Sequence, residues 1–200
     1  MPRSVEGASV AGVIALTVPN AVLLLLLGGL FVHFMIAGGR TFFFKDAERE
    51  GPAAYLSQFS FLFSGTMVTW GLGIRLPILA ANQVAAALLL VVSLALYEWA
   101  RHTIWGRRFG LAWGDHVPEA LCEDGPYRYI RHPIYLSYLL AFLAVLVALP
   151  HWITALTFLC NLALFVSGAR SDEQVIAGSA LAADYAAYRK RTGMFLPKLV

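Results

Sequence analysis

Charge is scarce in this chain of 200 residues: only 14% of its residues are Asp, Glu, Lys or Arg, whereas 59% are hydrophobic. Soluble domains carry about a quarter charged residues. The low charge excludes an intrinsically disordered chain, which needs many charged residues and few apolar ones. Together with a mean hydropathy of +0.68, it also excludes an ordinary soluble domain and indicates an integral membrane protein.

Cysteine is scarce as well, with only Cys122 in a polar stretch and Cys160 in an apolar run. Two cysteines exclude a disulfide-dense secreted scaffold, and these two surroundings predict no bridge between them. Together with His102 and His116, Cys122 matches no zinc-ligand spacing, so we expect no metal site. The sequence also has no phosphate-binding glycine loop and no Gly-x-Ser-x-Gly turn, which excludes the common nucleotide-binding and hydrolase motifs.

Long uncharged runs take the place of these features. Five of them are long enough, or nearly long enough, to cross a bilayer as helices, at residues 8–36, 53–74, 78–97, 134–149 and 152–169. The last two are joined by Pro150-His151 alone, which predicts an antiparallel hairpin. The sequence therefore predicts an all-α, polytopic membrane protein with about five transmembrane helices, a short C-terminal hairpin and a helical tail.

The first apolar run has a second interpretation, as a cleavable signal peptide. Its basic region is a lone Arg3, and no small-residue cleavage site precedes Gly38-Gly39, so we expect a retained span. The chain then divides into two parts. Residues 1–111 hold the first three spans and the start of a long polar loop, and residues 112–200 hold the rest of that loop, the hairpin and the tail.

The positive charges predict the orientation. With the N-terminus outside, the inside loops hold thirteen of the Lys and Arg residues and the outside holds Arg3 and Arg75. Cytoplasmic loops carry such an excess, so we expect the long loop and the tail on the cytoplasmic side, where they can meet. Because the charges flank membrane segments, a net charge of +3 indicates no nucleic-acid partner.

The densest group of unusual residues is the run GPYRYIRHPIY at 125–135. Pro133 suits the first turn of a helix, which makes His132 the residue that precedes the helix. The free N–H groups of such a helix start, with Arg128 and Arg131 beside them, favour an anionic group. Arginines and tyrosines are also common anchors at the membrane interface, but anchoring alone does not explain a titratable histidine before Pro133.

A second group follows residue 169. Asp172 and Glu173 are expected in the first turn of a tail helix, where the helix dipole favours negative charge. Capping alone would explain these acids, and a binding role for Glu173 is the alternative. Further along the tail, Tyr185, Tyr188 and Arg189 have the spacing of one helix face.

These motifs, in this order, resemble the isoprenylcysteine carboxyl methyltransferase family, which is related to membrane phospholipid methyltransferases. The resemblance covers about the last 90 residues, from GPYRYIRHPIY through the hairpin and the acidic residue to a Tyr-x-x-Tyr-Arg-x-Arg tail. The family usually has histidine where this chain has Glu119, and Val-Pro where it has Thr192-Gly193.

The resemblance implies a pocket for S-adenosylmethionine between the loop, the helix start and the acid. Carried over residue by residue, the implied contacts are Glu119, Ala120, Leu121, Cys122, Tyr127, His132, Pro133, Ile134, Tyr135 and Glu173. A carboxylate or thiolate acceptor needs a cation to hold it, a role that Arg170 or Arg191 could fill. The family links an arginine near Arg170, one position away, to the substrate carboxylate.

The predicted function is therefore an S-adenosylmethionine-dependent membrane methyltransferase that acts on a lipophilic or lipid-linked substrate, with carboxyl methylation of the isoprenylcysteine type as one form. Two alternatives stay open at this point. Membrane sterol and steroid reductases have a similar His-Pro-x-Tyr hairpin and bind NADPH. The other alternative is a small transporter or assembly subunit, although such proteins usually have ionisable residues at mid-membrane depth.

Overall fold

The computed structural model describes residues 25–30, 32–34, 80–105 and 117–198. These residues are mostly helical and form no β-strand, which confirms the all-α prediction for this part of the chain. The helices are α3 (Ala80–Ile104), the 3₁₀ helix η1 (Gly125–Arg128), α4 (Pro133–Ala148), α5 (Trp152–Ala177) and α6 (Ala182–Arg191). Residues 25–30 and 32–34 are also helical. Most of the predicted span 8–36, all of the span 53–74, and His116 lie outside the described residues.

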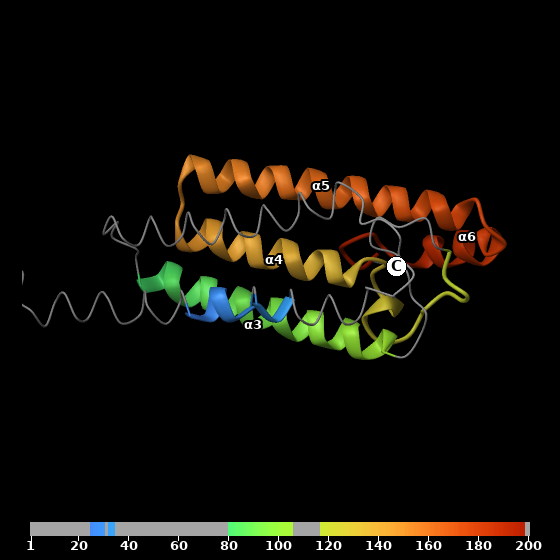
Figure 1. Ribbon diagram of the computed structural model, residues 1–200, viewed down its shortest axis with the longest axis horizontal. Coiled ribbons are helices and arrows are strands. Elements are labelled where there is room, and N and C mark those ends of the chain that lie inside the picture. Colours follow the sequence, from blue (N-terminus) through green and yellow to red (C-terminus); the bar gives the residue numbers. More distant parts are fainter. Residues whose placement is uncertain (1–24, 31, 35–79, 106–116, 199–200) are drawn as a thin grey trace, which may run out of the picture.

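The three long helices lie side by side, with α4 between α3 and α5 (Figure 1). The predicted antiparallel hairpin is present, since only residues 149–151 join α4 to α5. The helical residues 25–30 and 32–34 run beside α3, and α6 lies at the far end of α5 (Figure 1). One end of the bundle therefore collects the end of α3, the start of α4, the end of α5 and all of α6.

Two of the described helices, α3 and α5, are long and apolar enough to cross a membrane. The span predicted at 134–149 is present as α4, but its 16 residues extend roughly 24 Å, less than a typical hydrocarbon core. Large apolar side chains on α3 and α5 point outward, among them Leu88, Val91 and Leu159. Such faces suit contact with lipid.

The predicted end of the fifth helix was wrong. Residue 169 is not a helix boundary, because α5 continues through Arg170 to Ala177 and ends at Gly178. The stretch 170–177 contains neither Gly nor Pro, so nothing in it interrupts the helix. Since α4 begins at Pro133 and is much shorter than α5, the last turns of α5 extend beyond the start of α4. The polar loop, α6 and the tail occupy that end (Figure 1).

Small residues allow α3 and α4 to pack closely. Ala86 on α3 and Ala144 on α4 are buried, and the Ser93 hydroxyl donates a hydrogen bond of 2.7 Å to the backbone oxygen of Ser137. Helices in membranes associate through such small side chains and hydrogen bonds, because lipid gives no hydrophobic drive for their association. This interface fixes the position of α4 against α3.

An aromatic cluster joins the N-terminal helical residues to this pair. The ring of Phe34 lies 4.5 Å from that of Tyr97 on α3 and 4.9 Å from that of Tyr138 on α4, measured between centroids. Tyr138 in turn contacts Phe165 on α5, at 5.7 Å. Four helical segments thus share one aromatic core.

The turn at Gly125 holds the polar loop against the end of α3. Gly125 has φ +53°, and a Cβ there would lie 2.4 Å from the Oγ1 of Thr103. Only glycine combines this left-handed conformation with so close an approach. The turn at Gly125-Pro126 therefore places the following residues, through His132, at the helix ends.

Candidate functional site

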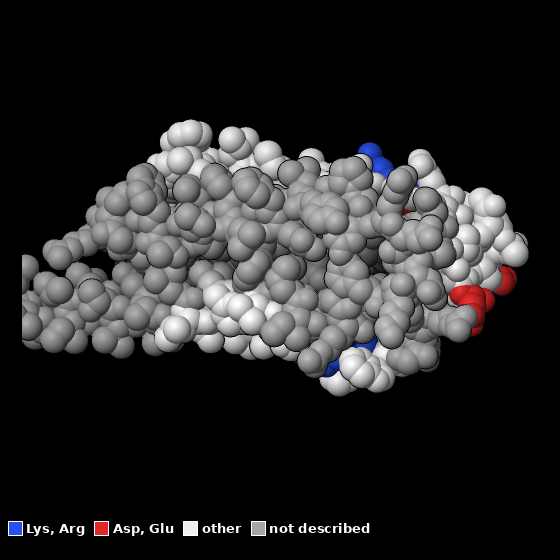
Figure 2. All heavy atoms as spheres, viewed as in Figure 1, with Lys and Arg blue, Asp and Glu red and all other residues white. Residues whose placement is uncertain are grey.

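The charges of the long helices lie at one end of the bundle. Charged residues in α3 begin at Glu98, α4 has none, and those in α5 begin at Arg170. On the face shown in Figure 2, the charged atoms of the described residues gather toward the end that carries α6, whereas the described surface toward the other end is uncharged. A polar site is therefore possible at this end of the bundle.

His132 and Glu173 meet there, as the sequence predicted. His132 is the residue before the first turn of α4, which begins at Pro133, and Glu173 lies near the end of α5. The Nε2 atom of His132 is 3.4 Å from the Oε1 atom of Glu173. Both side chains are largely buried. The start of α4 and an acidic residue near the end of α5 thus form one site.

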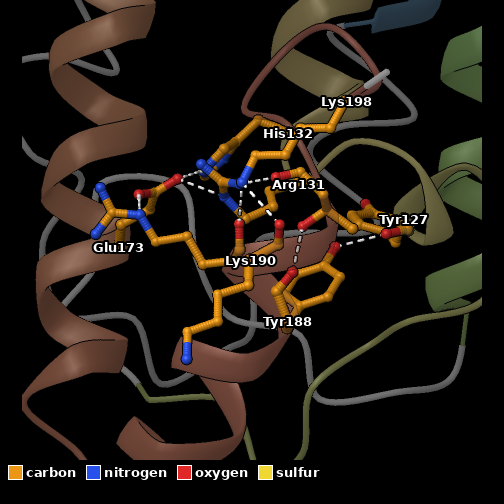
Figure 3. A network of polar contacts seen from close by, with 9 residues as sticks. Tyr127, Arg131, His132, Glu173, Tyr188, Lys190 and Lys198 are labelled. Atoms are coloured by element: carbon orange, nitrogen blue, oxygen red, sulfur yellow. Dashed lines mark hydrogen bonds and ion pairs between the residues drawn. The ribbon is translucent and has the colours of Figure 1, made fainter. Parts of the chain in front are cut away.

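Arg131 is the strongest partner of Glu173, and sequence reasoning missed this role. We expected Arg131 to face an incoming anion. Instead its Nε donates a hydrogen bond of 2.8 Å to Glu173 Oε1, and its Nη1 donates to the backbone oxygen of Thr192 (Figure 3). Arg189 also lies 3.6 Å from Glu173, but its side chain is 63% exposed, so water weakens this pair.

The predicted placement of the two acids relative to the helix dipole was also wrong. Asp172 and Glu173 lie in the last turns of α5 and not in the first turn of another helix. The dipole disfavours negative charge at that end, so capping cannot explain them. Their charges are compensated by side chains from α4 and the residues just before it.

The pKa of Glu173 reflects this compensation. Glu173 lies beyond the uncharged stretch 152–169 of α5. Burial raises its pKa, but the nearby His132 imidazole, 3.4 Å away, and the hydrogen-bonded guanidinium of Arg131 outweigh burial and lower it to about 2. Glu173 is therefore a carboxylate at neutral pH, and it can accept further hydrogen bonds from hydroxyl or ammonium groups.

Asp172 is buried on the neighbouring position of α5. It accepts a hydrogen bond of 2.8 Å from the hydroxyl of Tyr135, in the first turn of α4. The ring of Tyr135 stacks on that of His132, with centroids 5.4 Å apart and planes 9° from parallel. The two acids of α5 thus support the same histidine, one directly and one through a tyrosine.

The C-terminal segment covers this site. Ile130 and Gly193 form an isolated parallel bridge, and the backbone N–H of His132 donates to the oxygen of Met194 at 3.1 Å. Phe195 lies 6.2 Å from the His132 ring. Gly193 is required for this path, because a Cβ there would lie 1.7 Å from the backbone oxygen of Leu196.

The polar loop is held on α6 by Tyr188, whose hydroxyl donates a hydrogen bond of 2.6 Å to the backbone oxygen of Tyr127. Burial raises the pKa of both tyrosines, so both are neutral. Tyr185 is buried beside Tyr188, as the spacing of the tail predicted, and Arg189 reaches Glu173 from the same helix. Loop and tail therefore pack against each other at the same end of the bundle, as the sequence predicted.

The other residues that the resemblance implied lie at varied depths. Four are buried around the start of α4 or in the loop before it, namely Cys122, Pro133, Ile134 and Tyr135. Leu121 packs against α6, whereas Glu119 and Ala120 are exposed. The structure thus brings most of the implied residues to the His132 end of the bundle, with Glu119 and Ala120 at its surface.

The two arginines expected to hold an acceptor lie apart from the buried pair. Arg170 is exposed on α5, and Arg191 is exposed at the end of α6, where it pairs with Glu123. The described side chains that pair with Glu173 are instead Arg131, His132 and Arg189. Of the two predicted arginines, Arg170 is the one on α5, where it is the first charged residue after the uncharged stretch 152–169.

The sequence of the three long helices matches a known protein family. Residues 82–177 match the model of the phospholipid methyltransferase family. This part of the chain belongs to that family. The match runs from the first turns of α3 to the end of α5, so it contains His132, Asp172 and Glu173. No curated protein sequence gives a significant match to the chain.

Membership confirms the resemblance noted in the sequence, because this family includes membrane methyltransferases of the isoprenylcysteine carboxyl methyltransferase type. For the matched segment, the family implies a membrane methyltransferase and suggests a substrate of the lipid type. It also favours this function over the reductase and the transporter considered above. The phospholipid methyltransferase segment ends before α6, so the tail that covers His132 lies outside the matched region.

Proposed function

We propose that the protein transfers a methyl group from S-adenosylmethionine to a lipophilic or lipid-linked acceptor at the membrane surface. The observation that carries the proposal is the contact between His132 and Glu173. It joins two parts of the phospholipid methyltransferase segment at the end of the bundle where the apolar helices become polar. A polar cofactor and an apolar acceptor can both reach such a position.

The residues present fit the cofactor. Bound S-adenosylmethionine would supply an electrophilic methyl group on a sulfonium sulfur, together with ammonium, carboxylate and hydroxyl groups. The Glu173 carboxylate suits the ammonium or the hydroxyl groups, and His132 Nε2 is a buried polar atom without a hydrogen-bond partner among the described residues. An unsatisfied polar atom beside a carboxylate is typical of a ligand site. The cofactor contacts proposed from the resemblance are Glu119, Ala120, Leu121, Cys122, Tyr127, His132, Pro133, Ile134, Tyr135 and Glu173.

The chain's contribution to the reaction is positioning and exclusion of water. Methyl transfer from a sulfonium needs donor and acceptor in line, and alignment alone supplies much of the rate. Phe195 and Met194 shield the His132 side of the site, which reduces competition from water. A carboxylate acceptor needs no general base, so we assign no residue to proton removal.

For the acceptor, we propose an anionic group held by Arg170, as in carboxyl methylation of the isoprenylcysteine type. Arg170 is exposed at the point where α5 leaves its uncharged stretch, so a lipid chain beside α5 would carry its head group to this guanidinium. Arg191 is the less favourable candidate, because Glu123 already neutralises it. The Lys and Arg distribution supports a cytoplasmic position for this end of the bundle.

Methyl transfer to a lipid extract tests the function. The purified full-length protein in detergent is supplied with S-adenosylmethionine labelled in its methyl group and with extracted lipids, and the label in the lipid phase is counted. We expect incorporation by the wild-type protein and a loss of about a hundredfold in Glu173→Gln, as for other positioned groups. Asp184→Asn, the same change at an exposed acid on α6, is the matched control and should keep full activity. Absence of both cofactor binding and incorporation would contradict the proposal.

The stability of the product identifies the acceptor. A carboxyl methyl ester releases its labelled methyl group as methanol in mild base, whereas a methylated amine keeps it. With a prenylated cysteine as substrate, we expect a base-labile product and a higher KM for this substrate in Arg170→Gln. A base-stable product from the lipid extract, with no transfer to the prenylated cysteine, would show that the acceptor is an amine of the phospholipid type.

A further inference from the structure

The buried position of Asp172 lowers the stability of the fold unless other contacts compensate it. Its side chain is only 2% exposed, and it lies on α5 one position before Glu173. A buried carboxylate lowers stability unless hydrogen bonds compensate it, and an apolar residue of similar size would avoid this cost. Packing alone therefore does not explain an acid at this position.

The hydrogen-bond partner of Asp172 is Tyr135. The tyrosine hydroxyl donates to Asp172 Oδ2 at 2.8 Å, which ties the first turn of α4 to the end of α5. Tyr135 also contacts Phe165, with ring centroids 5.4 Å apart. The hydrogen bond holds the hydroxyl end of Tyr135, and the contact with Phe165 packs against its ring. Together they restrict rotation of the ring.

His132 depends on this ring for its orientation. Within the described part of the chain its Nε2 has no hydrogen-bond partner, and Glu173 at 3.4 Å is a weak constraint on direction. The nearly parallel stack on Tyr135 is therefore the contact that sets the plane of the imidazole. If Tyr135 shifts, the Nε2 atom loses its direction toward Glu173.

We propose that Asp172 is a positioning residue, which fixes His132 through the hydrogen bond to Tyr135 and the stack of Tyr135 on the imidazole. Its kinetic consequence depends on the function proposed above, because a displaced His132 would weaken the binding of S-adenosylmethionine. The hydrogen bond, and not the charge of Asp172, carries this effect. The amide of an asparagine accepts the same hydrogen bond.

Kinetics of Asp172 variants give the first test. We expect Asp172→Leu to raise the KM for S-adenosylmethionine about tenfold, below the hundredfold loss that a misplacement of about 1 Å can cause, and to change kcat much less. Asp172→Asn should restore the wild-type KM. Asn161→Leu, another buried polar residue on α5 but distant from His132, is the matched control and should change neither constant. An unchanged KM in Asp172→Leu, or an Asp172→Asn variant as impaired as Asp172→Leu, would overturn the proposal.

Chemical labelling of His132 gives a second test that needs no cofactor. Diethylpyrocarbonate modifies accessible imidazoles, and mass spectrometry compares the rate at His132 with that at the exposed His151 in the same molecule. We expect the rate at His132 to rise severalfold in Asp172→Leu and to stay at the wild-type value in Asp172→Asn and Asn161→Leu. If Asp172→Leu does not fold, Tyr135→Phe carries both tests, since it removes the same hydrogen bond. A wild-type labelling rate and KM in Tyr135→Phe would overturn the proposal.

The two tests separate the proposals. Faster labelling of His132 in a protein that transfers no methyl group would uphold the positioning role and contradict the proposed function. An active enzyme in which Asp172→Leu changes neither the labelling rate nor the KM would uphold the function and contradict the positioning role.

Discussion

The interior between α3 and α4 and the polar end around Glu173 are built in different ways. In the interior, small side chains and hydrogen bonds such as that from Ser93 to Ser137 hold two apolar helices together. At the polar end, Arg131 bonds to a residue 42 positions away and to another 61 positions away. The interior spreads its stability over many weak contacts, whereas the polar end depends on a few charges that compensate one another. Single substitutions should therefore have much larger effects at the polar end.

Removal of the central acid should have the largest effect. Glu173→Leu leaves the buried guanidinium of Arg131 without its carboxylate, and breaking a buried pair in this way costs about 3 kcal/mol or more. We expect a large fall in the unfolding temperature in detergent, together with loss of activity. The control Asp184→Leu removes an exposed acid on α6 and should leave the unfolding temperature nearly unchanged. Equal unfolding temperatures for the two variants would show that the Glu173 cluster does not hold this end together.

Loss of tail docking should come next. In Gly193→Ala the new methyl group meets the backbone oxygen of Leu196. Such overpacking typically lowers the free energy of unfolding by about 1–3 kcal/mol. We expect faster proteolysis of the C-terminal segment and a lower unfolding temperature. Gly178→Ala is the matched control, since its nearest neighbour would be 3.5 Å away, an ordinary contact. Similar proteolysis of the two variants would contradict the docking described here.

Acid should weaken the polar end selectively. The pKa of Glu173 falls from its ordinary value of 4.5 in the unfolded chain to about 2 in the folded protein. Its contribution to stability is therefore complete above about pH 4.5 and is lost as the pH falls toward 2. We expect the difference in unfolding temperature between wild type and Glu173→Gln to be constant near neutral pH and to shrink below about pH 4.5. A difference that stays constant through this window would show that ionised Glu173 does not stabilise the fold.

The smallest effect should come from the interior. Ser93→Ala removes one hydrogen bond between α3 and α4, and such bonds in membrane helices contribute only about 0.6 kcal/mol on average. We expect an unfolding temperature close to that of the wild type and full activity. A loss as large as that of Glu173→Leu would mean that the two regions do not differ in the way described above.

Much of the fold was predictable because it depends on local signals. Apolar runs located α3, α4 and α5, and Pro133 marked the start of α4 with His132 before it. The end of α5 was predicted wrongly at residue 169, where the apolar run ends. A helix does not end where its side chains become charged; it ends where the backbone is interrupted, here at Gly178.

The site was predictable in part. His132 and Glu173 were expected to meet, but the pairing of Arg131 with Glu173 and of Tyr135 with Asp172 was not expected. Arginine and acid residues at a membrane surface have many possible partners, and residue type alone does not choose between them. The choice depends on how far α5 extends beyond α4, which follows from the lengths of both helices and from their packing.

The sequence by itself determined that this is a helical membrane protein with a histidine at a helix start and an acid just beyond the last apolar run, because hydropathy and proline act locally along the chain. Tertiary structure alone decided which cations compensate which acids, and that the C-terminal segment covers His132. Those contacts join residues tens of positions apart, so they form only once the packed helices have set their ends at fixed distances.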